Sequence, residues 1–334
     1  MNKSIIKIIV GVLLLAIVLT VPTILPNNYY RGLANLSLIY VIVALGLNFI
    51  YGYTGYISFA QAAFFGVGAY TTALLGVDYH LSFWIALPIS GLMAAVFGII
   101  IGIPTLKLAG HYLAMATIGF GIIVQMIMQN WTAFTHGASG VGNIPGASIG
   151  NFAITSATHY YYFLLFFTAL AIFVTRRIAR SNFGRSFKAV REDEIAASTS
   201  GINLTFTKVF SFALSAFFAG IGGSLYATMS SYISPDTFSF DQSIIFFAMV
   251  LIGGPGTVSG PVLGAVLLTF VPELLRFLKE YYMALFGIGI VLIMLFIPQG
   301  IMNVFGSEGK LASWFHQKPQ HLATEGPVKN EGEG

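Results

Sequence analysis

The stretch at residues 209–235 reads VFSFALSAFFAGIGGSLYATMSSYISP and contains no Asp, Glu, Lys or Arg. It is longer than the roughly 20 apolar residues that a helix needs to cross about 30 Å of hydrocarbon. Ala216, Ala219, Gly220 and Gly223 bring small side chains to nearly one face of such a helix, as in close helix packing within membranes. The stretch therefore predicts a tightly packed membrane-spanning helix.

Charge-free runs also fill most of the remaining chain, at 32–77, 79–106, 108–175, 242–272 and 281–307. The 334 residues include only 16 Lys and Arg and 12 Asp and Glu, and 56% of the residues are hydrophobic. An ordinary soluble domain is about 25% charged, whereas this chain is 8% charged. The composition excludes a soluble globular enzyme and a disordered chain, argues against a nucleic-acid-binding protein, and, without Cys, excludes a disulfide-stapled secreted module. It predicts an all-α polytopic membrane protein.

The apolar runs predict about ten transmembrane segments within a transmembrane domain at 1–305. The first is expected to be an uncleaved span, because no A-x-A-like cleavage site follows it, with a cleaved signal peptide as the alternative. The eighth and ninth segments, 242–252 and 258–275, are separated by Gly-rich sequence and form a broken pair. The predicted spans are 5–25, 33–51, 57–76, 83–103, 111–131, 159–175, 206–230, 242–252, 258–275 and 283–303.

The basic residues give an orientation. With the N-terminus inside, 13 of the 16 Lys and Arg fall on the cytoplasmic side, as the positive-inside rule requires. Residues 176–208 alone hold seven of them and form the predicted main cytoplasmic loop. The charge-free segment 132–158 is predicted to be an external loop. The polar tail 306–334 is predicted to be disordered and cytoplasmic. Both termini are therefore expected in the cytoplasm.

The centre of the cytoplasmic loop, at 184–203, reads GRSFKAVREDEIAASTSGIN. Phe187, Val190, Glu194 and Ala197 are three or four residues apart and fall on one side of a helix, which Gly201 is suited to end. A short amphipathic helix between two spans is typical of a segment that docks into another protein. A solvated, positive-inside loop explains the basic residues equally well.

Two Gly-rich segments interrupt the apolar pattern, GYTGYISFAQAAFFGVGAY at 52–70 and GGPGTVSGPVLG at 253–264. Interrupted segments in each half of a membrane transporter are the best sequence indication of a substrate path. Close helix packing is the alternative explanation for so many glycines. The candidates for the path are Gly55, Ser58, Gln61, Gly66, Gly68, Gly253, Gly254, Gly256 and Thr257.

Several of these blocks resemble the permease subunits of ABC importers. The run Glu194 to Ala197, followed by Gly201 and Asn203, is similar to the family's cytoplasmic coupling loop, and 184–203 as a whole resembles the branched-chain amino acid permeases of the LivM type. Both Gly-rich segments and LAGHYLAMATIGFG at 108–121 also resemble that family. The resemblance covers about residues 30–305. The departures are Thr199-Ser200 before the glycine, His136 where Gly is common, and Ile122 where many members carry Glu.

The resemblance implies a non-enzymatic transport subunit in the plasma membrane that imports branched-chain amino acids. It implies a second homologous permease, two ATPase subunits that bind ATP and Mg²⁺, an extracytoplasmic solute-binding protein and lipid as partners, with no cofactor on this chain. The residues implied in ATPase coupling are Arg185, Arg191, Glu194, Ala196, Ala197 and Gly201.

Two alternatives stay open. One is the same family with urea, short amides or another small solute as cargo, and the other is an ion-coupled secondary transporter with broken helices. The sequence lacks the G-x-x-x-x-G-K-[ST] motif that cradles ATP phosphates and the H-E-x-x-H metal motif. We therefore expect neither a nucleotide site of that kind nor a metal centre on this chain.

Overall fold

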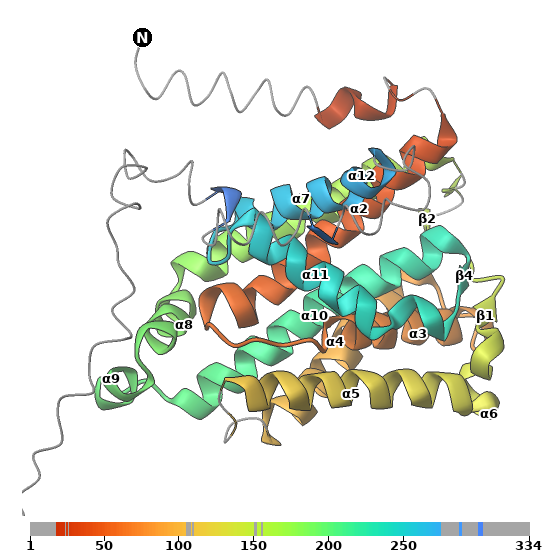
Figure 1. Cartoon of the computed structure of the whole chain (residues 1–334). Helices are drawn as coiled ribbons and strands as arrows, with labels where there is room; N and C mark the ends of the chain where they lie inside the picture. Colours follow the sequence, from red (N-terminus) through yellow and green to blue (C-terminus); the bar gives the residue numbers. More distant parts are fainter. Residues whose placement is uncertain are drawn as a thin grey trace, which may run out of the picture.

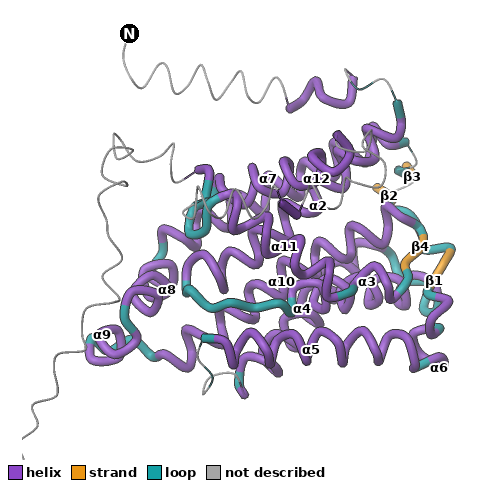
Figure 2. The backbone as a smooth tube through the Cα atoms, viewed as in Figure 1, coloured by secondary structure: helices purple, strands orange, loops and turns teal. Residues whose placement is uncertain are grey.

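The computed structural model describes residues 18–23, 25, 27–104, 108, 110–149, 152–154, 156–274, 287–288 and 300–302. Over these residues the chain is a bundle of α-helices with a few two-residue strands at one end (Figures 1 and 2). The main helices are α2 (Asn28–Asn48), which continues into a π-helix (Phe49–Tyr53), α3 (Gln61–Val77), α4 (Phe83–Gly102), α5 (His111–Asn130), α7 (Ala157–Arg180), α10 (Leu204–Ser230), α11 (Phe240–Gly253) and α12 (Ser259–Leu274).

Five of the described helices are long and apolar enough to cross a membrane, namely α2 with its π-helical extension, α4, α5, α7 and α10. Helices α3, α11 and α12 have 17, 14 and 16 residues. At about 1.5 Å per residue they reach only about 21 to 25 Å, less than the roughly 30 Å of a hydrocarbon core. Each of these three short helices adjoins one of the Gly-rich segments. The chain is thus an all-α membrane protein that combines long helices with short ones.

The predicted spans from 33–51 to 258–275 each fall on one of these helices, with ends that differ by a few residues. One difference is larger, because 57–76 includes residues 57–60, which are not helical. The predictions for 5–17, for most of 283–303 and for the tail 306–334 lie outside the described residues.

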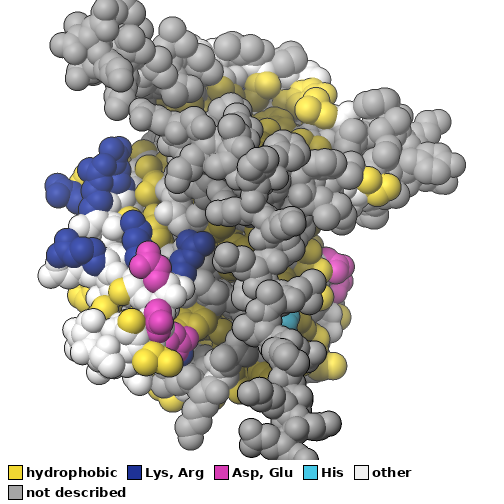
Figure 3. All heavy atoms as spheres, turned by 60° about the vertical axis from the view of Figure 1, so that its left-hand side comes forward, with side chains coloured by type: hydrophobic (Ala, Val, Ile, Leu, Met, Phe, Trp, Pro, Cys, Tyr) yellow, Lys and Arg dark blue, Asp and Glu magenta, His cyan; other side chains and the backbone are white. Residues whose placement is uncertain are grey.

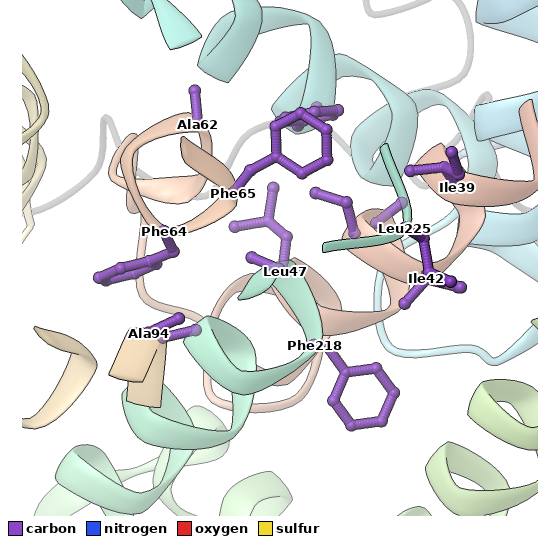
Figure 4. Packing of buried hydrophobic residues seen from close by; sticks show 14 of the residues in the cluster. Ile39, Ile42, Leu47, Ala62, Phe64, Phe65, Ala94, Phe218 and Leu225 are labelled. Carbon is purple, nitrogen blue, oxygen red and sulfur yellow. The ribbon is translucent and has the colours of Figure 1, made fainter. Parts of the chain in front are cut away.

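Helix α10 lies at the centre of the bundle and packs against α4, α3 and α2. Figure 4 shows Phe218 and Leu225 of α10 among apolar side chains of the neighbouring helices, and both are buried. Small residues allow the close approach, since a Cβ atom added at Gly68 of α3 would overlap the backbone of Gly220. The tight packing predicted from the small residues of 206–230 is therefore confirmed.

The first Gly-rich segment leaves helical geometry over residues 54–60, between the π-helix and α3. Backbone N–H groups without helical partners must find others inside the protein, because lipid offers none. Here the N–H of Phe59 donates to Oγ1 of Thr117 at 3.0 Å, and that of Ala62 donates to Oγ of Ser243 at 3.0 Å. Helices α5 and α11 thus hold this non-helical segment in place.

The second Gly-rich segment makes the turn from α11 to α12. Gly254 and Gly256 have φ angles of 120° and 80°, which residues other than glycine rarely adopt. The hydroxyl of Thr257 donates to the Gly254 carbonyl at 2.9 Å and accepts from the Gly260 N–H at 3.0 Å. A Cβ at Gly253 would overlap the Gly260 backbone, so the two helices pack closely just beside the turn.

The strands lie at the end of the bundle that is opposite the short helices α8 (Asn182–Glu192) and α9 (Glu194–Thr199) (Figure 1). Strand β1 (Val141–Gly142) pairs antiparallel with β4 (Tyr232–Ile233), and β2 (Ser148–Ile149) pairs antiparallel with β3 (Phe152–Ala153). The segment 132–158, predicted to be the external loop, contains both strands of the β2–β3 pair and strand β1 of the β1–β4 pair. It also contains the single-turn helix α6 (Thr132–Thr135) and a 3-10 turn (Gly137–Ser139). A further 3-10 turn (Pro235–Phe238) follows β4.

Candidate functional site

Three parts of the chain that are far apart in sequence meet at the end of the bundle where α8 and α9 lie. They are the π-helix after α2, the turn between α11 and α12, and the segment α8–α9 that links α7 to α10 (Figure 1). Lys and Arg side chains gather on this end, as Figure 3 shows from that side.

The predicted single helix over 187–197 is wrong, because the chain breaks at Asp193. That residue is extended, with φ −160° and ψ 115°, and it begins a second helix, α9. Its carboxylate accepts from the backbone N–H groups of Ile195 at 2.8 Å and Ala196 at 3.0 Å. Asp is a favoured N-cap residue for this reason. The sequence signal for the break is therefore an Asp, a favoured N-cap residue, inside a pattern whose apolar spacing otherwise indicates one continuous helix.

The faces of α8 and α9 follow the sequence pattern despite the break. Phe187, Val190 and Ala197 are buried, whereas the Ile195 side chain is 76% exposed. Gly201 has a φ angle of 82°, as expected for the residue that ends the segment. Helix α9 therefore holds on to the bundle through Ala197 and presents Ile195 and Ala196 outward.

A shallow apolar groove of about 230 Å³ lies beside α9, between α8 and the start of α10. Phe183 of α8 and Phe206 of α10 line it and are 46% and 53% exposed. The rings of Phe206 and Phe210 stack with centroids 5.5 Å apart. With Ile195, these rings form an exposed apolar surface on the end of the bundle that also carries the basic residues.

Glu194 anchors α9 to the rest of the protein. Its carboxylate accepts from the hydroxyl of Tyr56 at 2.7 Å and forms a 2.7 Å ion pair with Nζ of Lys208. Partial burial alone would raise the pKa of the Glu194 carboxyl, but the hydrogen bonds from Lys208 and Tyr56 outweigh it and hold that pKa below its usual value. Glu194 is therefore ionised at neutral pH and faces its own chain.

Asn48 joins the two Gly-rich segments. Its side chain is completely buried at the end of α2. The amide nitrogen donates to the Thr257 carbonyl at 2.8 Å, and the amide oxygen accepts from the Gly256 N–H at 3.0 Å. One side chain thus satisfies two backbone groups of the α11–α12 turn, which has few partners of its own.

Arg191, in the last turn of α8, reaches the same place. Its guanidinium donates to the carbonyl oxygen of Gly52, in the π-helix. A Cβ at Gly256 would lie 2.8 Å from Nη1 of Arg191, and a Cβ at Gly55 would lie 3.1 Å from its Cγ. A cleft of about 240 Å³ at this place is lined by Gly52, Tyr53, Lys188, Arg191, Glu192 and Gly256.

The structure divides the residues predicted for the two roles into groups. Of the residues predicted for coupling, Ala196 and Arg185 are exposed, and Arg185 donates to Asn182 of its own helix α8. Glu194 and Arg191 instead bind other segments of the chain. Of those predicted for the path, Gly55, Gly256 and Thr257 meet around Arg191 and Asn48.

Other predicted path residues lie elsewhere in the bundle. Ser58 and Gln61 are each only 1% exposed. The Gln61 amide donates to the Val43 carbonyl at 2.9 Å and accepts from Ser215 at 2.9 Å. Gly66 and Gly68 lie in contacts between α3 and its neighbours, and Gly253 and Gly254 lie in the α11–α12 turn beside Gly260 and Gly300.

Sequence reasoning missed Asn48, Tyr56 and Lys208. Asn48 gave a weak signal, because it is a polar side chain in a charge-free span, where polar groups need partners. Tyr56 and Lys208 gave none, since 138 residues separate Tyr56 from the Glu194 it contacts. In the described part of the chain no three His, Asp or Glu side chains group as metal ligands would. The groups gathered here hold backbone segments together.

Comparisons with known proteins agree on one family. The family described as the branched-chain amino acid transport system permease component matches residues 29–297. The permease protein LivM of the high-affinity branched-chain amino acid transport system of Salmonella typhimurium is 36% identical over 304 residues, covering 84% of this chain and 72% of that protein. The LivM protein of Escherichia coli K12 is also 36% identical, over 302 residues, covering 84% and 71%.

A more distant relative is the permease protein LivH of the Salmonella typhimurium system, which is 23% identical over 288 residues and covers 79% of this chain and 91% of its own length. No solved structure matches the chain. The match to the family, at residues 29–297, spans the helices that form the site, from α2 to α12.

Proposed function

The chain belongs to the family of branched-chain amino acid transport permeases, and from this premise we propose that it is the membrane-spanning subunit of an ATP-driven ABC importer that carries branched-chain amino acids inward. It is an integral inner-membrane protein and a transport subunit, not itself an enzyme. The observation that carries this function is the 36% identity to LivM over 84% of the chain.

The importer we propose contains a second, homologous permease and two ATPase subunits. The relatives named LivM and LivH are both permease proteins of such systems, and both match this chain over most of its length, which supports a pair of similar permeases. ATP and Mg²⁺ would bind to the ATPase subunits. A solute-binding protein would deliver the amino acid at the opposite end of the bundle, where β1 and β4 lie.

The ATPase contact is proposed at α9 and the apolar groove beside it. Ile195, Phe183 and Phe206 are 76%, 46% and 53% exposed there. Arg185 of α8 and Ala196 of α9 are exposed on the same two helices. Glu194, Ala197 and Gly201 hold the shape of the segment, and this indirect role replaces the direct ATPase contact expected for Glu194.

The proposed topology has ten transmembrane segments with both termini in the cytoplasm. Eight are the helices α2, α3, α4, α5, α7, α10, α11 and α12, and the remaining two are 5–25 and 283–303. Arg185, Lys188 and Arg191 on α8, together with Lys208 near the start of α10, support a cytoplasmic α8–α9 segment. The transport path is proposed to pass the two Gly-rich segments.

Transport then follows from alternating states of the bundle. Binding of ATP would bring the ATPase subunits together and move α8 and α9, which opens the bundle outward, and hydrolysis would reset it. A ligand shifts such an equilibrium only through contacts that differ between the states. The α8–α9 segment is suited to this role because specific contacts join it to the bundle, namely those of Arg191 with Gly52 and of Glu194 with Tyr56 and Lys208.

The proposed function predicts ATP-dependent uptake of leucine. The chain is reconstituted in proteoliposomes with its partner permease, ATPases and binding protein, and uptake of labelled leucine, urea and ribose is measured. We expect leucine uptake alone, and its loss when the ATPase subunits carry a substitution of their phosphate-binding Lys. Leucine uptake that persists with those ATPases and follows an ion gradient would contradict the ABC mechanism, and uptake of urea or ribose in place of leucine would contradict the substrate.

A further inference from the structure

We propose that Arg191 is a positioning residue for transport, because its guanidinium ties the α8–α9 segment to both Gly-rich helix breaks, so that movement of the segment displaces both breaks together. This inference rests on the proposed function and deepens it. It assigns Arg191 an action within its own chain, whereas the resemblance implies only that it belongs to the ATPase-coupling loop.

The first tie runs from α8 to the π-helix. The guanidinium of Arg191 donates to the carbonyl oxygen of Gly52, 139 residues away in sequence. Carbonyl groups at the C-terminal end of a helix lack partners within the helix, and they carry the negative end of the helix dipole. A positive charge on this carbonyl therefore satisfies the end of a membrane-spanning helix and fixes α8 to it.

The second tie runs from Arg191 to the turn between α11 and α12. A Cβ at Gly256 would lie 2.8 Å from Nη1 of Arg191 and 3.0 Å from the Gly52 carbonyl oxygen. The guanidinium therefore packs against the backbone of this turn, where Gly256 leaves room for it. At Gly55, in the first break, a Cβ would lie 3.1 Å from Cγ of Arg191, so that the stem of Arg191 also packs against that break.

The two breaks are also fixed to each other. A Cβ at Gly52 would lie 2.5 Å from the Gly256 N–H nitrogen and would overlap the Asn48 amide that bridges the breaks. The π-helix and the α11–α12 turn thus pack closely against each other and are bridged by the Asn48 amide. We therefore expect a displacement of Arg191 to move the two breaks together.

Two explanations of these contacts make different predictions. If Arg191 only caps the end of the π-helix, its loss weakens the fold and lowers ATP hydrolysis and uptake in the same proportion. If it transmits movement, its loss leaves the ATPases docked and hydrolysing while the breaks no longer follow. The amount of leucine imported per ATP hydrolysed separates the two.

The experiment uses the complete importer in proteoliposomes with the variants Arg191→Ala, Arg191→Gln and Arg191→Lys. The control is Arg180→Ala, which removes an exposed guanidinium from the last turn of the neighbouring helix α7. For Arg191→Ala and Arg191→Gln we expect ATP hydrolysis near the wild-type rate and leucine uptake per ATP lowered about tenfold, the order expected when a charged hydrogen bond is lost in one state only. Arg191→Lys, which keeps one charged donor, should restore part of the ratio, and Arg180→Ala should not change it.

The proposal is overturned if uptake per ATP is unchanged in Arg191→Ala, or if all three Arg191 variants, including the Lys variant, lose hydrolysis and uptake in proportion or fail to assemble. Failure of the proposed function has a different signature, because the wild-type complex itself would then show no ATP-dependent leucine uptake.

Discussion

An Asn48→Leu substitution is expected to destabilise the purified chain by about 1 to 3 kcal/mol or more, since two partly buried backbone groups lose their partner and an unpaired buried group costs about 1 to 3 kcal/mol. Leucine has the same branched arrangement of non-hydrogen atoms as asparagine but can neither donate to the Thr257 carbonyl nor accept from the Gly256 N–H. Those groups lie in a half-buried turn, and the Asn48 side chain that pairs them is fully buried. The measurement is thermal unfolding of the detergent-solubilised chain, together with the yield of monodisperse protein.

Asn35→Leu is the matched control for this prediction. Asn35 lies in the same helix and is 2% exposed, but its amide nitrogen makes one bond, to the Ala157 carbonyl at 3.0 Å, and its amide oxygen has no partner. Its replacement therefore leaves one group unpaired and removes another unpaired group. Equal destabilisation by the two substitutions would show that the Asn48 bridge has no special weight.

A Gly68→Ala substitution is expected to prevent the normal packing of α3 on α10. The added Cβ would overlap the backbone of Gly220, which cannot move aside as a flexible side chain can. Interiors are packed too densely to absorb an atom between two backbones, and overpacking of this kind typically costs about 1 to 3 kcal/mol or more. We expect a lower melting temperature and a loss of folded protein on size-exclusion chromatography.

Gly119→Ala provides the comparison, because it introduces the same methyl group into a membrane helix with no atom within 4 Å of the new Cβ. Alanine is a better helix former than glycine by about 1 kcal/mol, so this variant should unfold at the same temperature as the wild type or above it. If Gly68→Ala matches Gly119→Ala, helices α3 and α10 do not approach as closely as described.

Much of the fold could be predicted because membrane helices follow from local composition. A charge-free run of sufficient length gives a helix almost regardless of its neighbours, and the positions of α4, α5 and α10 agree with the predicted spans within a few residues. The start of α3 was less predictable. Residues 57–60 are mostly apolar but not helical, and the N–H groups of Phe59 and Ala62 donate to hydroxyl groups of Thr117 and Ser243 on other helices, which local sequence does not reveal.

The candidate site was predicted only in part, for a related reason. The local sequence predicts where a helix ends at a glycine and which face of α8 and α9 is buried, and Gly201 and Ala197 lie as predicted. The local sequence does not predict the partners of Glu194, Arg191 and Asn48, because each contact joins segments that only the tertiary fold brings together. The resemblance implies a role in ATPase coupling for Arg191 and Glu194, and in the structure both bind their own chain.

The most direct test of the central claim is to ask which protein covers α9 in the assembled importer. The chain has no Cys, so Ile195→Cys introduces a single thiol, which is labelled with a photoreactive maleimide before the complex is irradiated. Tyr232→Cys, at the opposite end and 51% exposed in the native residue, is the control. The account predicts that the label at residue 195 cross-links to an ATPase subunit and that the label at residue 232 does not. A complex that still imports leucine with ATP but shows no cross-link between residue 195 and an ATPase subunit would contradict it.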